Sequence, residues 1–226
     1  MDLGLQRTTA LLAALDQPQQ RVPFLHIAGT NGKGSTVAFL ASIFRQAGLR
    51  VGTYSSPHFL HPRDAIRLNG VALSLDAWRQ LRERVDATAT MHNLAATEFE
   101  RETVVAWLAF DDARVDLAVV ECGLGGRLDA TNAGHTPASA AEAANPCKLA
   151  CVVAPIGLDH QRLLGDTVEA IAAEKAGIFT TEGGLVVLAA QSDPAADAVL
   201  ASAASKMNCK ASSDVGRDAV CRQHRI

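Results

Sequence analysis

Several features are scarce or missing in this sequence of 226 residues. Its five cysteines form an odd set without C-x-x-C spacing, which suggests neither a disulfide framework nor a zinc site. No apolar run approaches the length that spans a bilayer, and the N-terminal stretch MDLGLQRTTALLAAL lacks the continuous apolar core of a signal peptide. We therefore expect a cytoplasmic protein that is neither secreted nor inserted in a membrane.

The chain also has no large excess of charge of one sign. Its net charge is -3 and its isoelectric point is about 6.1, so no overall field attracts it to nucleic acid or to an acidic membrane. An anion site must therefore be local. The 48% of hydrophobic residues suffice for a globular core.

Apolar runs rich in β-branched residues alternate with helical patterns along most of the chain. This alternation predicts an α/β fold with a mostly parallel sheet and helices on both faces. The expected strands are 22–28, 49–55, 116–122, 149–156 and 185–190, and the expected helices are 34–47, 75–90, 97–113, 166–177 and 193–206. Two segments break the rhythm: 134–148 is expected to be an exposed loop and 205–226 an irregular tail.

A glycine-rich turn follows the first expected strand and leads into a helix. Such a turn directs backbone N–H groups and the positive end of a helix dipole at one point, where a phosphate can bind. The turn comprises Gly29, Thr30, Asn31, Gly32, Lys33, Gly34, Ser35 and Thr36. It departs from the pattern G-x-x-x-x-G-K-[ST], because Ile27 replaces the first glycine and Gly34 replaces the hydroxyl residue. An ordinary βα turn is the alternative, but it would not need the lysine and both hydroxyls.

The variant GTNGKGS resembles the loop of the Mur-type ligases, and specifically that of the folylpolyglutamate synthase/dihydrofolate synthase family. Glycine after the lysine favours this folate branch over the peptidoglycan ligases. Four further stretches agree with the family in the same order: YSSPHF (54–59), ECGLGGRLDATN (121–132), GLDHQRLLGDT (157–167) and IAAEKAGIF (171–179). The resemblance implies a P-loop-type mononucleotide-binding domain like the central domain of Mur ligases, with ATP and Mg²⁺ as cofactors.

Three polar residues stand at or just beyond the ends of expected strands: Ser56, Glu121 and His160. The carboxyl ends of parallel strands share one sheet edge, where ligands of α/β proteins bind. Taken alone, Glu121 could equally be a capping or solvated residue, and His160 a loop histidine. The resemblance implies that these three residues hold the magnesium of MgATP.

Lys175 interrupts the apolar stripe of the expected helix 166–177. The stripe contains Val168, Ile171 and Ala172, so Lys175 lies on the inward face, where it must snorkel, pair with an anion or lose its charge. Asp166 is expected to cap this helix, with Glu169 completing a capping box, and Gly177 to end it. The resemblance implies that Lys175 is carbamylated and, with Lys33 and His160, takes part in catalysis.

The resemblance also implies a pterin or folate pocket. Its candidate residues here are Pro57, His58, Asp64, Asp129 and Asn132. The family pattern N-E-R-I is replaced by Arg63-Asp64-Ala65-Ile66. Asp64 keeps the carboxylate of the family's glutamate on a shorter side chain, and Ala65 lacks the positive charge of the family's arginine.

The family's C-terminal domain carries a D-G-A-H-N-like motif that has no counterpart in 191–226. We therefore expect an ATP-binding domain over 1–204, incomplete at its C-terminal end, a tail over 205–226, no glutamate-ligase domain, and a truncated product of a longer ligase gene.

The implied reaction adds L-glutamate to dihydropteroate or a folate through an acyl phosphate. A nucleotide-binding remnant without ligase activity and, less favoured, a peptidoglycan ligase are the alternatives. The expected partners are these small molecules, with neither nucleic acid nor membrane, and the chain is expected to be a monomer.

Overall fold

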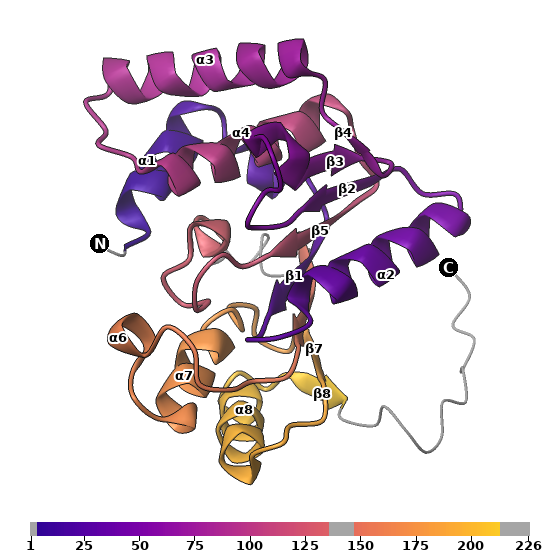
Figure 1. Cartoon of the computed structure of the whole chain (residues 1–226), viewed down its shortest axis with the longest axis vertical. Helices are drawn as coiled ribbons and strands as arrows, with labels where there is room; N and C mark the ends of the chain where they lie inside the picture. Colours follow the sequence, from indigo (N-terminus) through magenta and orange to yellow (C-terminus); the bar gives the residue numbers. More distant parts are fainter. Residues whose placement is uncertain (1–3, 136–146, 213–226) are drawn as a thin grey trace.

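The computed structural model describes residues 4–135 and 147–212, which form one α/β layer structure around an eight-stranded sheet (Figure 1). The strand order is β4-β3-β2-β5-β1-β6-β7-β8. Strands β2, β5, β1, β6, β7 and β8 run parallel, while β3 and β4 form an antiparallel edge. The strands are β1 (Phe24–Ala28), β2 (Val51–Tyr54), β3 (Ile66–Leu68), β4 (Val71–Ala72), β5 (Leu117–Glu121), β6 (Lys148–Val153), β7 (Leu185–Leu188) and β8 (Lys210–Ser212).

Helices cover both faces of the sheet, as the sequence predicts. The α-helices are α1 (Gln6–Ala14), α2 (Lys33–Gln46), α3 (Leu75–Met91), α4 (Glu98–Asp112), α6 (Gln161–Leu164), α7 (Val168–Ala176) and α8 (Pro194–Lys206). Short 3₁₀ turns occur at η1 (Pro18–Gln20), η2 (Pro62–Ala65) and η3 (Ala130–Asn132). Helix α2 lies on one face, and α1, α4, α7 and α8 lie toward the other (Figure 1).

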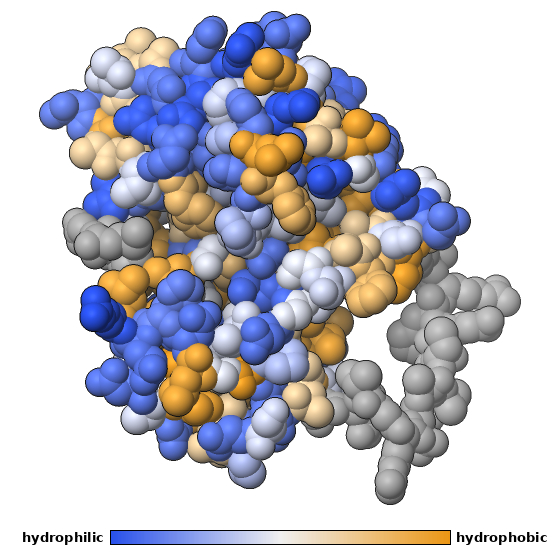
Figure 2. Space-filling model, in the orientation of Figure 1, coloured by the Kyte–Doolittle hydropathy of each residue, from blue (hydrophilic) through white to orange (hydrophobic). Residues whose placement is uncertain are grey.

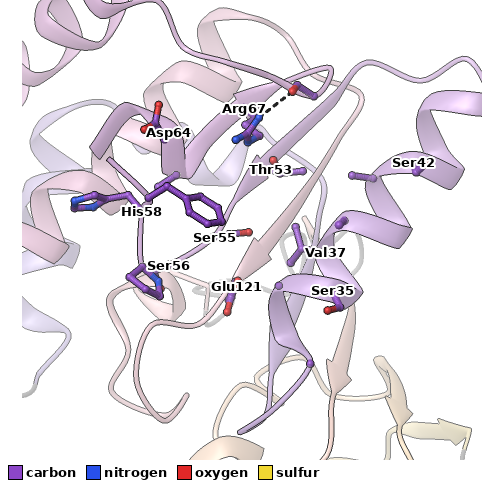
Figure 3. A pocket seen from close by; sticks show the side chains of 18 of the residues that line it. Ser35, Val37, Ser42, Thr53, Ser55, Ser56, His58, Asp64, Arg67 and Glu121 are labelled. Carbon is purple, nitrogen blue, oxygen red and sulfur yellow. Dashed lines mark hydrogen bonds between the residues drawn. The ribbon is translucent and has the colours of Figure 1, made fainter. Parts of the chain in front are cut away.

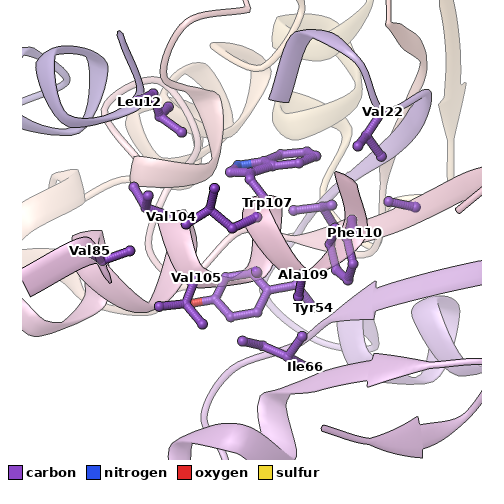
Figure 4. Packing of buried hydrophobic residues seen from close by; sticks show 14 of the residues in the cluster. Leu12, Val22, Tyr54, Ile66, Val85, Val104, Val105, Trp107, Ala109 and Phe110 are labelled. Carbon is purple, nitrogen blue, oxygen red and sulfur yellow. The ribbon is translucent and has the colours of Figure 1, made fainter. Parts of the chain in front are cut away.

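The largest hydrophobic cluster lies between α4 and the sheet. Trp107, Phe110 and Val105 of α4 pack against Tyr54 of β2 and Phe24 of β1, all of them almost fully buried (Figure 4). The rings of Phe24 and Trp107 meet edge to face, with centroids 5.0 Å apart. A capping box at Thr97 fixes the start of α4, because the Thr97 hydroxyl accepts from the amide of Glu100 and the Glu100 carboxylate accepts from that of Thr97.

Helix α2 packs against the opposite face through a narrower apolar stripe. Val37 and Ala41 contact Ile27, Val51 and Val119 of the three central strands. The outer side of α2 exposes Phe39 and Ile43, with 71% and 61% of their surface accessible. Hydrophobic colour gathers over the middle of α2 in Figure 2, whereas the surface near α3 is mainly hydrophilic. Within the described residues no helix is long and apolar enough to cross a membrane.

The structure corrects four expectations about local structure. The helix at 166–177 is shorter: it spans Val168–Ala176 and is capped by the hydroxyl of Thr167, which accepts from the amide of Ala170. Asp166 is therefore not the cap. The expected loop at 134–148 ends earlier, because Lys148 begins β6, and residues 136–146 lie outside the described residues. In the expected irregular tail, Lys210–Ser212 pairs with β7, and residues 213–226, including DVGRDA, lie outside the described residues.

Candidate nucleotide-binding site

The glycine-rich turn sits at the carboxyl edge of the sheet, between β1 and α2. Gly29 has φ of +143° and approaches β6 so closely that a Cβ there would lie 2.7 Å from Cβ of Ala154. The amides of Thr30 and Asn31 donate to the carbonyl of Pro155, at 3.0 and 3.2 Å. Gly32, with φ of +84°, then directs the chain into α2. The turn is thus bound to the segment after β6 and leads directly into the helix N-terminus.

Lys33 is the first residue of α2 and lies inside the turn. Its ammonium group donates to the carbonyl of Thr30 at 3.3 Å and lies 3.9 Å from Oε1 of Glu121. The lysine side chain is 18% exposed, so its charge is only partly screened by water. This geometry places a cation at the N-terminus of a helix, where a phosphate can bind.

Glu121 is the last residue of β5, and it shares the α2 face of the sheet with Val119, two residues earlier. The residue is only 4% exposed, and its Oε2 atom is buried without a hydrogen-bond partner. Gly34 adjoins this oxygen: a Cβ on Gly34 would lie 3.5 Å from Oε2. Burial raises the pKa of Glu121, while the nearby charge of Lys33 lowers it. A buried, unpartnered carboxylate oxygen beside the turn fits a hard cation.

Lys175 of α7 reaches the same turn from the other face of the sheet. It is 4% exposed, and its Nζ donates to the carbonyl of Gly29 at 2.8 Å. Burial, reinforced by the charge of Lys33, lowers the pKa of Lys175 to about 8. The inward position that the sequence indicates is confirmed.

The segment after β5 holds α7 in place through close backbone contacts. The amide of Arg127 donates to the carbonyl of Glu174 at 2.8 Å, and its guanidinium pairs with the Glu174 carboxylate at 2.8 Å. A Cβ on Gly126 would lie 2.8 Å from the carbonyl oxygen of Lys175. This contact is not among the sequence-based predictions, although the glycine-rich run GLGGR is a signal of close backbone approach.

A cavity of about 630 Å³ opens between α2 and the β2–β3 side of the sheet. In Figure 3, Glu121, Ser55, Thr53 and Arg67 lie on the sheet side, and Ser35, Val37 and Ser42 lie on α2. Five residues named from the sequence line this cavity: Gly32, Gly34, Ser35, Ser56 and Glu121. Three of the candidate pterin residues also line it: Pro57, His58 and Asp64. The Asp64 carboxylate accepts from the amide of His61 at 2.9 Å, a contact that lowers its pKa and fixes the turn.

The other candidate pterin residues, Asp129 and Asn132, are not brought to this cavity. Asp129 is 3% exposed and accepts from the amides of Leu124 and Thr131, at 2.7 and 3.0 Å. Asn132 accepts from Nζ of Lys148 at 2.8 Å and donates to the carbonyl of Gly177 at 3.0 Å. Both side chains therefore hold backbone segments together.

His160 is also absent from the residues that line the cavity. Its imidazole is 54% exposed, and Nε2 lies 3.6 Å from the carboxylate of Asp159. Among the described residues no group of three or more His, Cys, Asp or Glu side chains gathers as a ready-made metal centre. The structure thus brings Ser56 and Glu121 together at the cavity and leaves His160 apart from them.

Several known proteins are similar to this chain in sequence. No family model matches the chain. Dihydrofolate synthetase of Saccharomyces cerevisiae is 41% identical over 180 residues, which cover 80% of this chain and 40% of the yeast protein. Dihydrofolate synthase/folylpolyglutamate synthase of Bacillus subtilis is 38% identical over 198 residues, covering 85% of this chain and 43% of that protein. The matched part of the chain belongs to the folylpolyglutamate synthase/dihydrofolate synthase family.

Solved structures of folylpolyglutamate synthases have the same fold. The Mycobacterium tuberculosis enzyme complexed with ADP and AMPPCP is 31% identical, with a TM-score of 0.80, and covers 93% of this chain and 47% of its own. A bifunctional folylpolyglutamate synthase/dihydrofolate synthase with Mn, AMPPNP and L-glutamate bound is 34% identical, also with a TM-score of 0.80. The chain spans 40–43% of the length of the yeast and Bacillus relatives and about half of these solved structures.

Proposed function

We propose that this chain binds ATP as its magnesium complex at the turn Gly29–Thr36. The relatives with this fold include complexes with ADP, AMPPCP and AMPPNP. Support from the chain itself comes from the ammonium of Lys33, which lies within the turn at the N-terminus of α2. The unpartnered Oε2 of Glu121 beside Gly34 carries the proposal furthest, because a buried anionic oxygen next to a phosphate site requires a cation.

Glu121 and Ser56 are the proposed magnesium ligands of this chain. Both supply oxygen, which Mg²⁺ prefers, and both line the same cavity. When bound, the ion would neutralise charge on the phosphate oxygens. His160 joins this set only by family resemblance, and its ring would have to move from Asp159 to serve as a ligand.

The proposed reaction is ATP-dependent amide formation between L-glutamate and dihydropteroate or a folate. A carboxylate oxygen of the acyl substrate attacks the γ-phosphorus of ATP, which gives an acyl phosphate and ADP. The glutamate amine then attacks the acyl carbon, and phosphate leaves as the amide forms. Lys33 and the turn amides stabilise the charge that develops on the transferred phosphoryl group.

Lys175 is proposed to act as a carbamate. Carbon dioxide adds to a neutral amine, and burial lowers the pKa of Lys175 to about 8, which increases the neutral fraction near physiological pH. Carbamylation replaces the positive charge of Lys175, near Lys33, with a negative charge. This change would relieve the repulsion between the two lysines, and it would release the Gly29 carbonyl from its present donor.

Nucleotide binding without ligase activity is the second candidate function. It rests on the phosphate turn alone, where Lys33 lies 3.9 Å from Glu121 and donates to the carbonyl of Thr30. A site that does not exclude water hydrolyses an acyl phosphate instead of passing it to an amine.

One experiment separates the two candidates. The purified chain is incubated with MgATP, dihydropteroate and L-glutamate, while nucleotide binding and dihydrofolate formation are measured together. Binding with product formation supports the ligase, and binding without product supports the second candidate. Absence of nucleotide binding contradicts both.

A further inference from the structure

The cavity beside the phosphate turn continues well beyond the residues used in the proposed reaction. Its sheet wall carries Glu121, Ser55, Thr53 and Arg67 in succession (Figure 3). Its helix wall carries small and polar residues on one side of α2, namely Gly34, Ser35, Ala38, Ser42 and Arg45. Both walls therefore lead from the Glu121 end to an arginine. At 1.5 Å per residue, Ser35 and Arg45 are about 15 Å apart along α2.

The two arginines meet at the turn between β3 and β4. Arg67 donates from Nη1 to the carbonyl of Gly70 at 3.2 Å. Gly70 has φ of +84°, and a Cβ there would overlap Nη1 of Arg45, so the glycine leaves room for that guanidinium. Asn69 holds the turn against β2, because its side-chain oxygen accepts from the amide of Val51 at 2.9 Å. Two cations thus lie beside one backbone turn at this end of the cavity, where Arg67 is held by a hydrogen bond and Arg45 is exposed.

This basic end lacks a counter-ion. Within residues 4–135 and 147–212 neither Arg45 nor Arg67 forms an ion pair with a carboxylate. The two carboxylates that line the cavity are otherwise engaged. Asp64 accepts from backbone amides and lies 3.9 Å from Nε of Arg63, and Glu121 lies beside Lys33. A carboxylate from outside could therefore bind both guanidinium groups without displacing an existing salt bridge.

We propose that Arg45 and Arg67 form a carboxylate subsite for the glutamyl tail of a folate substrate. This inference rests on the proposed function and specifies the substrate class of the same site. The reacting carboxylate lies at the Glu121 end, and a second carboxylate of an extended tail reaches the arginines past the hydroxyls of Ser42 and Thr53. Dihydropteroate has a single carboxylate and cannot occupy both ends, so the subsite favours chain extension over the first glutamylation.

The test compares ligand binding by the full chain and by Arg45→Ala and Arg67→Ala. Titrations are carried out with MgATP, with a triglutamylated folate in the presence of a non-hydrolysable ATP analogue, with dihydropteroate, and with free L-glutamate. Each variant should bind the triglutamylated folate about tenfold more weakly, as for the loss of a charge-assisted hydrogen bond. Affinities for MgATP and dihydropteroate should stay unchanged. Arg84→Ala is the matched control, because Arg84 is exposed on α3, away from the cavity.

The outcomes separate this inference from the proposed function. If the variants bind the triglutamylated folate as well as the original chain, or if they weaken only free L-glutamate, the tail subsite is wrong. A chain that binds MgATP but not the triglutamylated folate also overturns the subsite while leaving nucleotide binding intact. Loss of MgATP binding by the unmodified chain instead contradicts the proposed function. Arg67→Lys, which keeps the charge, should recover part of the lost affinity if the subsite is correct.

Discussion

Nζ of Lys175, on α7, donates to the carbonyl of Gly29 at 2.8 Å, which links α7 to the phosphate turn. The two residues are separated by 146 positions in the sequence. The contact holds the buried Lys175 near the partly exposed Lys33, whose charge adds to the effect of burial in lowering the pKa of Lys175. The turn therefore depends on α7 for its shape as well as on β1 and α2.

Lys175 is expected to take up carbon dioxide. In ¹³C-bicarbonate, NMR of the chain should show a carbamate carbonyl signal that is absent from Lys175→Met. The signal should strengthen as the pH rises from 7 toward 8, because the neutral amine becomes more abundant as the pH approaches the lysine pKa of about 8. An unchanged signal in Lys175→Met would assign the carbamate to another amine.

Glu121→Gln should remove the magnesium dependence of nucleotide binding. The substitution keeps the size of the side chain but replaces the unpartnered anionic oxygen with a neutral group. The affinity for ATP in the presence of Mg²⁺ should fall about tenfold or more, while the affinity in EDTA should change little. Glu98→Gln is a matched control on exposed surface, next to Arg82. If Mg²⁺ raises the affinity for ATP equally in Glu121→Gln and in the original chain, Glu121 is not a magnesium ligand.

Gly126→Ala should destabilise the fold near α7. A Cβ at this position would lie 2.8 Å from the carbonyl oxygen of Lys175 and 2.9 Å from Cγ2 of Ile178, so backbone must shift. The expected loss is about 1–3 kcal/mol in the free energy of unfolding. Gly157→Ala is the control, because a Cβ there meets nothing within 4 Å. Chemical denaturation of both variants measures the difference, and equal stability would show that α7 accommodates the methyl group.

Lys148 should make the stability of the chain depend on pH in the alkaline range. It is 4% exposed, it donates to Asn132, Ile178 and Thr180, and burial lowers its pKa to about 8. Because the unfolded lysine titrates near pH 10.4, the unfolded chain binds more protons between these values. The contribution of Lys148 to the free energy of unfolding therefore increases as the pH rises above 8. The limiting slope is about 1.4 kcal/mol per pH unit.

The measurement compares unfolding free energies of the original chain and Lys148→Met between pH 7.5 and 9. The buried thiol of Cys151, whose pKa burial raises to about 11, opposes the trend but is present in both proteins. Lys148→Met should therefore show a less positive slope than the original chain. Lys206→Met, at the exposed end of α8, should keep the original slope. Parallel slopes for Lys148→Met and the original chain would contradict the burial of a lysine at this position.

The sequence predicts the central fold because its signals there are strong and local. The runs at β1, β5, β6 and β7 are apolar on both faces, and the glycine-rich turn follows β1 directly. The antiparallel edge β3–β4 was missed, because its strands are only 3 and 2 residues long. Its turn, Asn69-Gly70, is nevertheless a typical hairpin signal that could have predicted it.

The candidate site is predicted less completely than the fold, because side-chain direction depends on distant segments. Glu121 and Lys33 follow from strand and helix ends, and the structure places them 3.9 Å apart. Asp129 and Asn132 lie in RLDATN, a motif that matches the family pattern. In the structure, however, the Asp129 side chain is hydrogen-bonded to Leu124 and that of Asn132 to Lys148, so both point into the protein interior. The Arg45–Arg67 pair has no motif, because it forms only where the β3–β4 turn meets the end of α2.

Calorimetric titration with MgATP shows whether the turn Gly29–Thr36 binds the nucleotide through Lys33 and Glu121. Binding of MgATP to the original chain, Lys33→Ala and Glu121→Gln is measured by calorimetry, with circular dichroism to verify that each variant is folded. We expect saturable binding at one site in the original chain and at least a tenfold weaker affinity in folded Lys33→Ala. Equal affinity in folded Lys33→Ala and the original chain would exclude Lys33 as a phosphate ligand, and no binding by the original chain would exclude a nucleotide site at this turn.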